Sequence, residues 1–161
     1  MANDLPDHPG SENSQLLCVR LGEQEFALSI RAVREIRGWI SSTPLPHAPS
    51  YIKGMINLRG SVLAIIDLAE RLGLPCTTAN ATSVVVVIEA GERVIGLLVD
   101  AVSDIITVTS EMRQVTPETG SAASREYVEG LLMRDQQIVS VLSIEAIMPK
   151  DTTLEVVLQA A

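Results

Sequence analysis

The chain has 161 residues, of which 47% are hydrophobic but only 2% aromatic, so we expect one domain of ordinary size with an aliphatic core. Its 12 basic and 20 acidic residues give a net charge of −8, which disfavours nucleic acid and anionic membranes as partners. No apolar run approaches the roughly 20 residues that span a bilayer, and residues 1–14 lack the apolar centre of a signal peptide. These features predict a cytoplasmic protein without direct membrane insertion.

Four hairpins are predicted along the chain. Each consists of two apolar strands around a short polar turn, followed by a residue that can cap a helical turn. The strand pairs, in chain order, are residues 16–21 with 25–30, 55–58 with 61–66, 83–89 with 93–99, and 127–133 with 137–142. The capping residues are Ser29, Asp67, Asp100 and Ser143, and the helical segments after them are 30–36, 68–73, 101–103 and 144–147.

This spacing favours an all-β fold, mainly β with short helices. Close antiparallel hairpins are typical of small barrels, and the pattern lacks the long crossover helices that connect parallel strands. Connecting strands, such as residues 105–108, bring the count to about ten, more than one small barrel closes around. We therefore expect two small barrels that share a seam lined by the helical turns, and such a seam is a natural groove for a partner.

The ends of the chain differ from this core. Residues 1–14 are polar and contain prolines and a glycine, so a flexible N-terminal tail is expected. Residues 15–150 form the predicted β domain, with a loop rich in Pro, Gly and Ser at 116–124. Residues 151–161 are a C-terminal tail, where the helical spacing of the apolar residues predicts a short helix.

Few residues form patterns typical of catalytic, metal or cofactor sites. The two histidines, His8 and His47, stand apart, and Cys18 and Cys76 form no CxxC or Cys/His pair, so neither a metal site nor a cofactor site is predicted. The sequence has no nucleophile elbow, P-loop or dinucleotide fingerprint. We therefore expect a binding protein that is not an enzyme.

From the residues alone, two alternatives to a binding module stay open. One is an enzyme that uses Asp67, Asp100 and Asp104, since carboxylates that converge can divide the acid and base roles. Capping of free backbone N–H groups is the simpler role for Asp67 and Asp100. The other alternative is a barrel that binds a small ligand, which requires a deep apolar pocket inside one barrel.

The second hairpin ends in a turn, Arg59-Gly60, that projects an arginine. Gly60 can adopt the positive φ that a tight turn requires. The simplest role of Arg59 is that of a solvated turn residue, because loops are exposed by default. A role in contact with a partner depends on the rest of the chain.

Several motifs together resemble one known family. They are EIRG at residues 35–38, IKG at 52–54 leading into INLRG, IIDL at 65–68, and GLLVDAVSDII at 96–106. In this order they resemble the CheW-like family of chemotaxis coupling proteins over about residues 16–147. Because no receiver, kinase or phosphotransfer segment is left over, the resemblance is to a stand-alone coupling protein rather than to the adaptor CheV or the related domain of the kinase CheA.

The resemblance implies two five-stranded barrels of the Src-homology type and a function without catalysis or cofactors. It implies an adaptor, or scaffold, that couples the cytoplasmic domains of methyl-accepting chemoreceptors to the regulatory domain of the histidine kinase CheA, in arrays at the membrane. A coupling protein of another chemosensory system, such as one for pili or surface behaviour, is the alternative within the family.

The family's receptor-facing groove would fall on six residues of this chain: Val33, Glu35, Gly54, Arg59, Val102 and Ile105. Glu35 and Arg59 are expected to form a salt bridge that braces the turn. Val33 and Ile105 fit a role in the core equally well. One departure is Ala64, where the family's strand usually carries a proline, and its presence would leave that strand edge more open to pairing. The resemblance assigns no residues to the kinase-facing surface.

Overall fold

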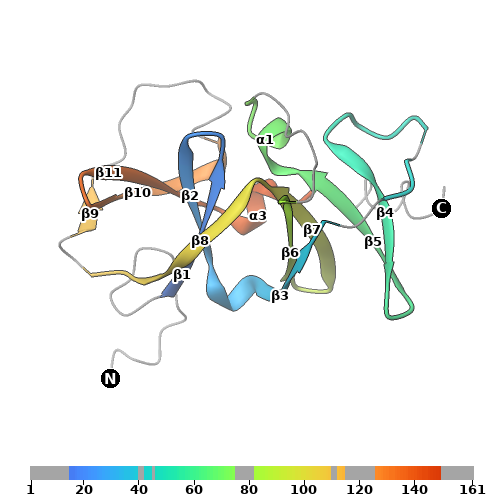
Figure 1. Cartoon of the computed structure of the whole chain (residues 1–161), viewed down its shortest axis with the longest axis horizontal. Helices are drawn as coiled ribbons and strands as arrows, with labels where there is room; N and C mark the ends of the chain where they lie inside the picture. Colours follow the sequence, from blue (N-terminus) through green and yellow to red (C-terminus); the bar gives the residue numbers. More distant parts are fainter. Residues whose placement is uncertain are drawn as a thin grey trace.

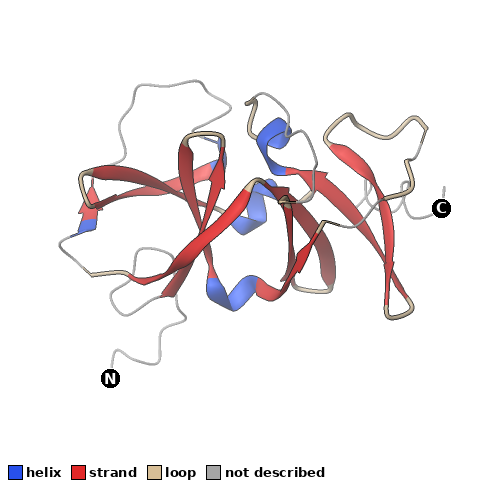
Figure 2. Cartoon of the chain, viewed as in Figure 1, coloured by secondary structure: helices blue, strands red, loops and turns tan. Residues whose placement is uncertain are grey.

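The computed structural model describes residues 15–39, 42–44, 46–74, 82–109, 112–114 and 126–149. Strands dominate this part of the chain (Figure 2) and form two sheets (Figure 1). Sheet A has the order β8-β1-β2-β11-β10-β9, with β1 Gln15–Leu21, β2 Gln24–Ser29, β8 Ala101–Thr107, β9 Arg113–Gln114, β10 Val128–Arg134 and β11 Gln137–Leu142. Sheet B has the order β3-β6-β7-β5-β4, with β3 Val33–Gly38, β4 Ile52–Leu58, β5 Ser61–Asp67, β6 Val84–Ala90 and β7 Arg93–Val99.

The two sheets repeat one five-stranded unit. In sheet A the hairpin β1–β2 lies between β8 and β11, and β10 follows β11, while in sheet B the hairpin β6–β7 lies between β3 and β5, and β4 follows β5. In both units one contact is parallel, β2–β11 and β7–β5, and the other strand pairs are antiparallel. The predicted mainly β fold with two five-stranded units is confirmed, although its pairing is not wholly antiparallel. The two-residue strand β9 is an addition to sheet A.

The chain moves between the units twice. It leaves sheet A after β2 to enter sheet B at β3, and it returns from β7 to sheet A at β8. The hairpin β1–β2 therefore completes a unit whose other strands come from the far end of the described chain.

Three clusters of buried side chains hold the strands together. One lies within sheet A, one lies within sheet B, and the third, the shared core, draws side chains from both sheets and from the helices α1 Leu68–Arg71 and α3 Ile144–Ile147. Members of the shared core include Val19, Phe26, Ile66, Leu68, Leu97, Leu142 and Ile147. Each fully buried Leu or Ile contributes about 1.5–3 kcal/mol to folding. The small-ligand alternative needs a deep apolar pocket inside one unit, and the packed side chains of the described residues give it no support.

Two of the four predicted caps are present. Asp67 accepts a hydrogen bond from the backbone N–H of Glu70 at 3.2 Å, at the start of α1 Leu68–Arg71. Ser143 accepts one from Ala146 at the same distance, at the start of α3 Ile144–Ile147. Both side chains satisfy a backbone donor that a helix start leaves free.

The other two predicted caps and their helical segments are wrong. The side chain of Ser29 makes no cap hydrogen bond, and only the short 3-10 turn η2 Ile30–Ala32 precedes β3. Asp100 leads directly into β8, and its carboxylate accepts a hydrogen bond from the backbone N–H of Gly22 at 2.6 Å.

β-Bulges explain why β3 and β8 were predicted as partly helical. Arg34 in β3 and Ser103 in β8 are left out of the pairing register with β6 and β1. An unpaired residue of this kind interrupts the two-residue alternation by which a strand is read from sequence.

Ala64 lies in the interior of sheet B. Its strand β5 has β4 on one side and β7 on the other, and Ala64 pairs with Met55 and Ile95. Only 2% of its surface is exposed. The expectation that Ala64 leaves an open strand edge is therefore wrong, because β5 has a neighbour on both sides.

Some predictions fall outside the described residues. These are the flexible N-terminal tail at 1–14, the loop at 116–124 and the C-terminal tail at 151–161. None of the described helices has the length and hydrophobicity needed to cross a membrane.

Candidate partner-binding site

The hairpin β4–β5 ends in a two-residue turn that presents Arg59. Leu58 pairs with Ser61, and between them Arg59 and Gly60 both have positive φ, 53° and 88°. Two such residues are typical of a type I′ turn, whose twist matches that of the flanking strands. The N–H of Gly60 donates to Asn57 Oδ1 at 3.0 Å. Sequence reasoning predicted the positive φ of Gly60 but missed that of Arg59, whose left-handed backbone costs roughly 1–2 kcal/mol.

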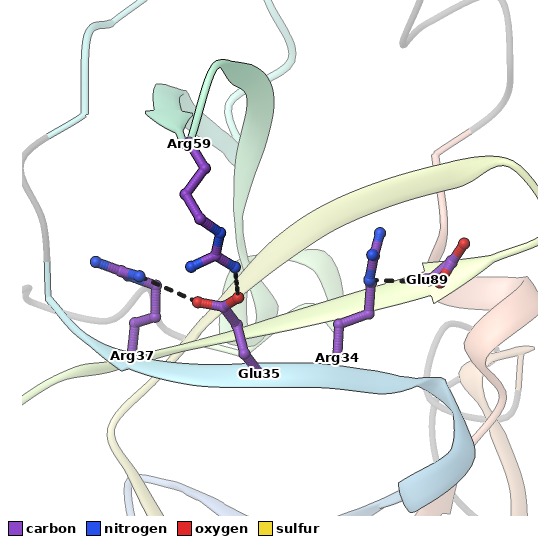
Figure 3. A network of polar contacts seen from close by, with 5 residues as sticks. All are labelled: Arg34, Glu35, Arg37, Arg59 and Glu89. Carbon is purple, nitrogen blue, oxygen red and sulfur yellow. Dashed lines mark hydrogen bonds and ion pairs between the residues drawn. The ribbon is translucent and has the colours of Figure 1, made fainter.

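The guanidinium of Arg59 reaches back to β3 and pairs with Glu35 (Figure 3). Glu35 Oε2 also accepts a hydrogen bond from Arg37 Nη1 at 3.1 Å. Because β3 and β4 are the two outer strands of sheet B, the Arg59–Glu35 pair ties the hairpin tip to the opposite edge of the sheet. The Arg59 side chain is 69% exposed and that of Glu35 is 24% exposed, so the guanidinium stays accessible to a partner while the carboxylate anchors it.

The neighbouring arginines lower the pKa of Glu35 below its ordinary value of 4.5. The hydrogen bond from Arg37 is the largest cause, and the hydrogen bond from Arg59 is the next. Both favour the charged form of the carboxyl group. Glu35 is therefore an ionised, fixed acceptor at neutral pH.

A cavity of about 370 Å³ opens beside this pair. Two of its lining residues, Leu63 and Val87, are buried apolar side chains, whereas most of the other lining residues are polar or charged. Arg34 supplies a charge at its side and holds Nε 3.6 Å from Glu89 Oε1 (Figure 3). The lining residues are Arg34, Glu35, Leu58, Arg59, Ser61, Leu63 and Val87.

Known proteins share this fold and much of this sequence. The family model described as CheW-like domain matches residues 15–152. The chain belongs to the CheW-like domain family. This confirms the resemblance found in the motifs.

Two CheW relatives match most of the chain. A probable chemotaxis protein CheW from Rhizobium etli is 48% identical over 133 residues, which cover 83% of this chain and 86% of the relative. The chemotaxis protein CheW from Rhizobium meliloti is 42% identical over 144 residues, or 89% of this chain and 93% of the relative. The crystal structure of the scaffolding protein TtCheW from Thermoanaerobacter tengcongensis is similar with a TM-score of 0.77 and 26% identity, covering 86% of this chain and 94% of that one.

Val33 and Val102, which the CheW resemblance assigns to the groove, occupy matching places in the two units. Each stands just before the bulge of an outer strand, β3 or β8, and each packs, half-buried, against the shared core. Ile105 lies farther along β8 and is 54% exposed. The structure thus brings Glu35 and Arg59 together at the cavity, whereas Val102 and Ile105 come from the other sheet and do not line it.

Gly54 is required by packing within the chain. Its φ is 155°, and a β-carbon there would lie 2.5 Å from the backbone oxygen of Thr43 and 2.8 Å from Ser42 Oγ. Thr43 forms a β-bridge with Met55, the next residue of β4. Only glycine allows this close approach, so Gly54 shapes the strand that carries the Arg59 turn.

The three aspartates of the enzyme alternative have separate partners. Asp67 caps α1, and its Oδ2 lies 3.7 Å from Lys53 Nζ. The carboxylate of Asp100 accepts a hydrogen bond from the backbone N–H of Gly22. Asp104 forms an ion pair with Arg134. Each carboxylate is thus engaged on a different element, so the structure gives no support to an acid/base set. This agrees with the scaffold character of the CheW family.

Sequence reasoning missed six residues around the site, Arg34, Arg37, Leu58, Ser61, Leu63 and Val87. Arg34 directly precedes the EIRG motif and Arg37 lies within it, and the charges of these two residues near Glu35 were the available signal. Leu63 and Val87 come from β5 and β6, which are not neighbours in sheet B. No local sequence pattern predicts that these two side chains line one cavity.

Proposed function

We propose that this protein is a non-catalytic adaptor of bacterial chemotaxis that couples the cytoplasmic domains of chemoreceptors to the histidine kinase CheA. Its membership of the CheW-like family and its curated relatives support the proposal. The observation that locates the proposed site is the Arg59 turn, which Glu35 braces beside a cavity.

The proposed receptor contact is a helix packed against this face, the helix-in-groove mode of recognition. Apolar side chains of the helix would contact Val33, Val102 and Ile105. Arg59 would direct its free guanidinium N–H groups to an acceptor on the helix, since this planar group donates in a fixed geometry. The exposed Arg59–Glu35 pair adds little to stability, so its role is to orient the guanidinium.

The second proposed partner is the regulatory domain of CheA. Receptor, kinase and adaptor would then assemble into an array, and the receptors would recruit this protein to the membrane. A net charge of −8 is consistent with recruitment by proteins rather than by anionic lipid or nucleic acid. Such a role requires no cofactor.

A charge reversal at the turn tests the site. Receptor signalling-domain fragments and CheA are combined with either wild-type protein or the Arg59→Glu variant, and autophosphorylation of the kinase is measured with and without receptor. Arg59→Glu should lower receptor-dependent activation, because the new carboxylate repels Glu35 and the donors are lost. Arg20→Glu, which changes an exposed arginine on β1 of sheet A, is the matched control and should activate normally.

Thermal unfolding shows whether both variants keep the fold. Activation by a folded Arg59→Glu variant at the wild-type level would refute the role of the turn. Failure of the wild-type protein to co-sediment with receptor fragments and kinase would refute the adaptor function itself.

A coupling protein of another chemosensory system is the second candidate. The protein PilI of Pseudomonas aeruginosa is 29% identical over 119 residues, which cover 73% of this chain and 66% of the relative. The higher identity of the chemotaxis relatives favours chemotaxis. The receptor and kinase that co-purify with this protein would distinguish the two systems.

A further inference from the structure

The repeat of the two units extends to individual residues around one point. Tyr51 and Tyr127 stand immediately before β4 and β10, and their carbonyl oxygens accept hydrogen bonds from the backbone N–H groups of Asp67 and Ser143, both at 2.8 Å. Both strands then carry a bulge at their second residue. Tyr51 and Tyr127 are therefore equivalent positions, as are the two N-cap residues.

The equivalence ends at the last residue of the two helices. α1 ends in Arg71, whereas α3 ends in Ile147. The guanidinium carbon of Arg71 lies 4.5 Å from the ring centroid of Tyr51 and 5.2 Å from that of Tyr127. Its Nε donates to the carbonyl oxygen of Ile147 at 3.1 Å. A single side chain thus contacts both equivalent tyrosines and the opposite helix.

We infer that Arg71 is a positioning residue that fixes the arrangement of the two five-stranded units. Arg71 and Tyr51 belong to the sheet B unit, and Tyr127 and Ile147 belong to the sheet A unit, so these contacts join one unit to the other. A planar guanidinium held by two aromatic rings and a carbonyl restricts direction as well as distance. The aliphatic contacts of the shared core are not directional, so they restrict the relative orientation of the two units less than the contacts of Arg71 do.

A second arginine reaches the same region. Arg93 of β7 donates from Nη1 to the carbonyl oxygen of Pro149 at 3.2 Å, just beyond α3. Both arginines therefore hold the segment around α3 to the sheet B unit. Helices of four residues have no stability of their own, so α3 depends on contacts of this kind.

Distances between spin labels on the two units test the inference. Val62→Cys on β5 and Ile138→Cys on β11 provide label sites that are 44% and 56% exposed, in a protein whose Cys76 is replaced by serine. With Arg71 in place, we expect one narrow distance distribution. Arg71→Met should broaden or shift it, because both ring contacts with the cation and the hydrogen bond are lost. Arg71→Lys keeps the cation, so its distance distribution should be intermediate between those of the protein with Arg71 and of Arg71→Met.

Arg34→Met is the matched control, because Arg34 pairs with Glu89 of the same sheet, and it should leave the distribution unchanged. An unchanged distribution in Arg71→Met would overturn the inference. If Arg71→Met does not fold, Arg71→Lys and Tyr51→Leu replace it, and unchanged distributions in both of these variants would overturn the inference.

The consequence for signalling rests on the proposed function. Arg71→Met should lower both receptor-dependent activation of CheA and co-sedimentation with the receptor fragment, because the proposed receptor contacts Arg59 and Val102 lie on different units. An altered distance together with wild-type activation would refute the signalling role of Arg71. A wild-type protein that fails to activate the kinase would refute the proposed function and leave the distance result intact.

Discussion

Glu35 is the residue on which the electrostatics of the site depend. Its pKa lies below 4.5 because of hydrogen bonds from Arg37 and then Arg59, so Arg37→Gln and Arg59→Gln should each raise it, Arg37→Gln by more. The pKa of Glu35 is lower in the folded than in the unfolded state, so its hydrogen bonds with the two arginines stabilise the fold at neutral pH. This stabilisation is lost as the pH falls through the folded pKa. A titration of the Glu35 carboxyl carbon by NMR measures the shift. Titration of the wild-type residue at its ordinary value would contradict the geometry.

Gly54 offers a second test at the residue scale, because the repeat provides a matched control. Gly54→Ala should destabilise the fold by about 1–3 kcal/mol, since the new β-carbon meets Thr43 at a positive φ. Gly130 follows the corresponding bulge in β10, and a β-carbon there would have no neighbour within 4 Å. Gly130→Ala should therefore be close to neutral. Denaturant unfolding compares the two, and equal losses would contradict the role given to Thr43.

At the scale of elements, each sheet ties a hairpin arginine to a carboxylate on an outer strand. Arg59 pairs with Glu35 of β3 in sheet B, and Arg134 at the end of β10 pairs with Asp104 of β8 in sheet A. Glu35 and Asp104 both directly follow the bulge of their strand. The two ion pairs thus close corresponding sides of the two units.

The ion pair of sheet A can be compared with an ordinary surface pair. The Arg134 side chain is 26% exposed, and its two terminal nitrogens both engage Asp104, so Arg134→Met should cost about 1 kcal/mol of unfolding free energy. Arg34 and Glu89 are 57% and 43% exposed, and Arg34→Met should cost less than about 0.5 kcal/mol. Thermal unfolding measures both, and an equal or larger loss in Arg34→Met would contradict the closing role of Arg134.

The elements that were predictable from sequence are those built from local contacts. Two segments of alternating apolar and polar residues around a short turn predict a hairpin. A polar residue before a helical turn predicts a cap, as at Asp67 and Ser143. The outer strands β3 and β8 were misread because the bulges at Arg34 and Ser103 interrupt their alternation and because each pairs with a strand far away in sequence. At the site, Glu35 and Arg59 were predicted from family motifs. The cavity beside them was not predictable, because its lining depends on the order of the strands in the sheet.

At the scale of the whole molecule, the sequence predicted two units but not how the chain divides between them. The parallel contacts β2–β11 and β7–β5, and the two passages between sheets, join segments that no local pattern relates. The same is true of Arg71, whose partners Tyr51, Tyr127 and Ile147 lie on separate segments. Because the proposed receptor contacts Arg59 and Val102 lie on different units, their relative position depends on this junction.

The adaptor function is tested most directly by adding this protein in increasing amounts to fixed amounts of receptor signalling-domain fragments and CheA, with autophosphorylation of the kinase as the readout. We expect the kinase to stay at its basal rate when only receptor or only this protein is present, and to rise when both are present. The same rate with and without this protein, over the whole range of concentrations, would contradict the adaptor function.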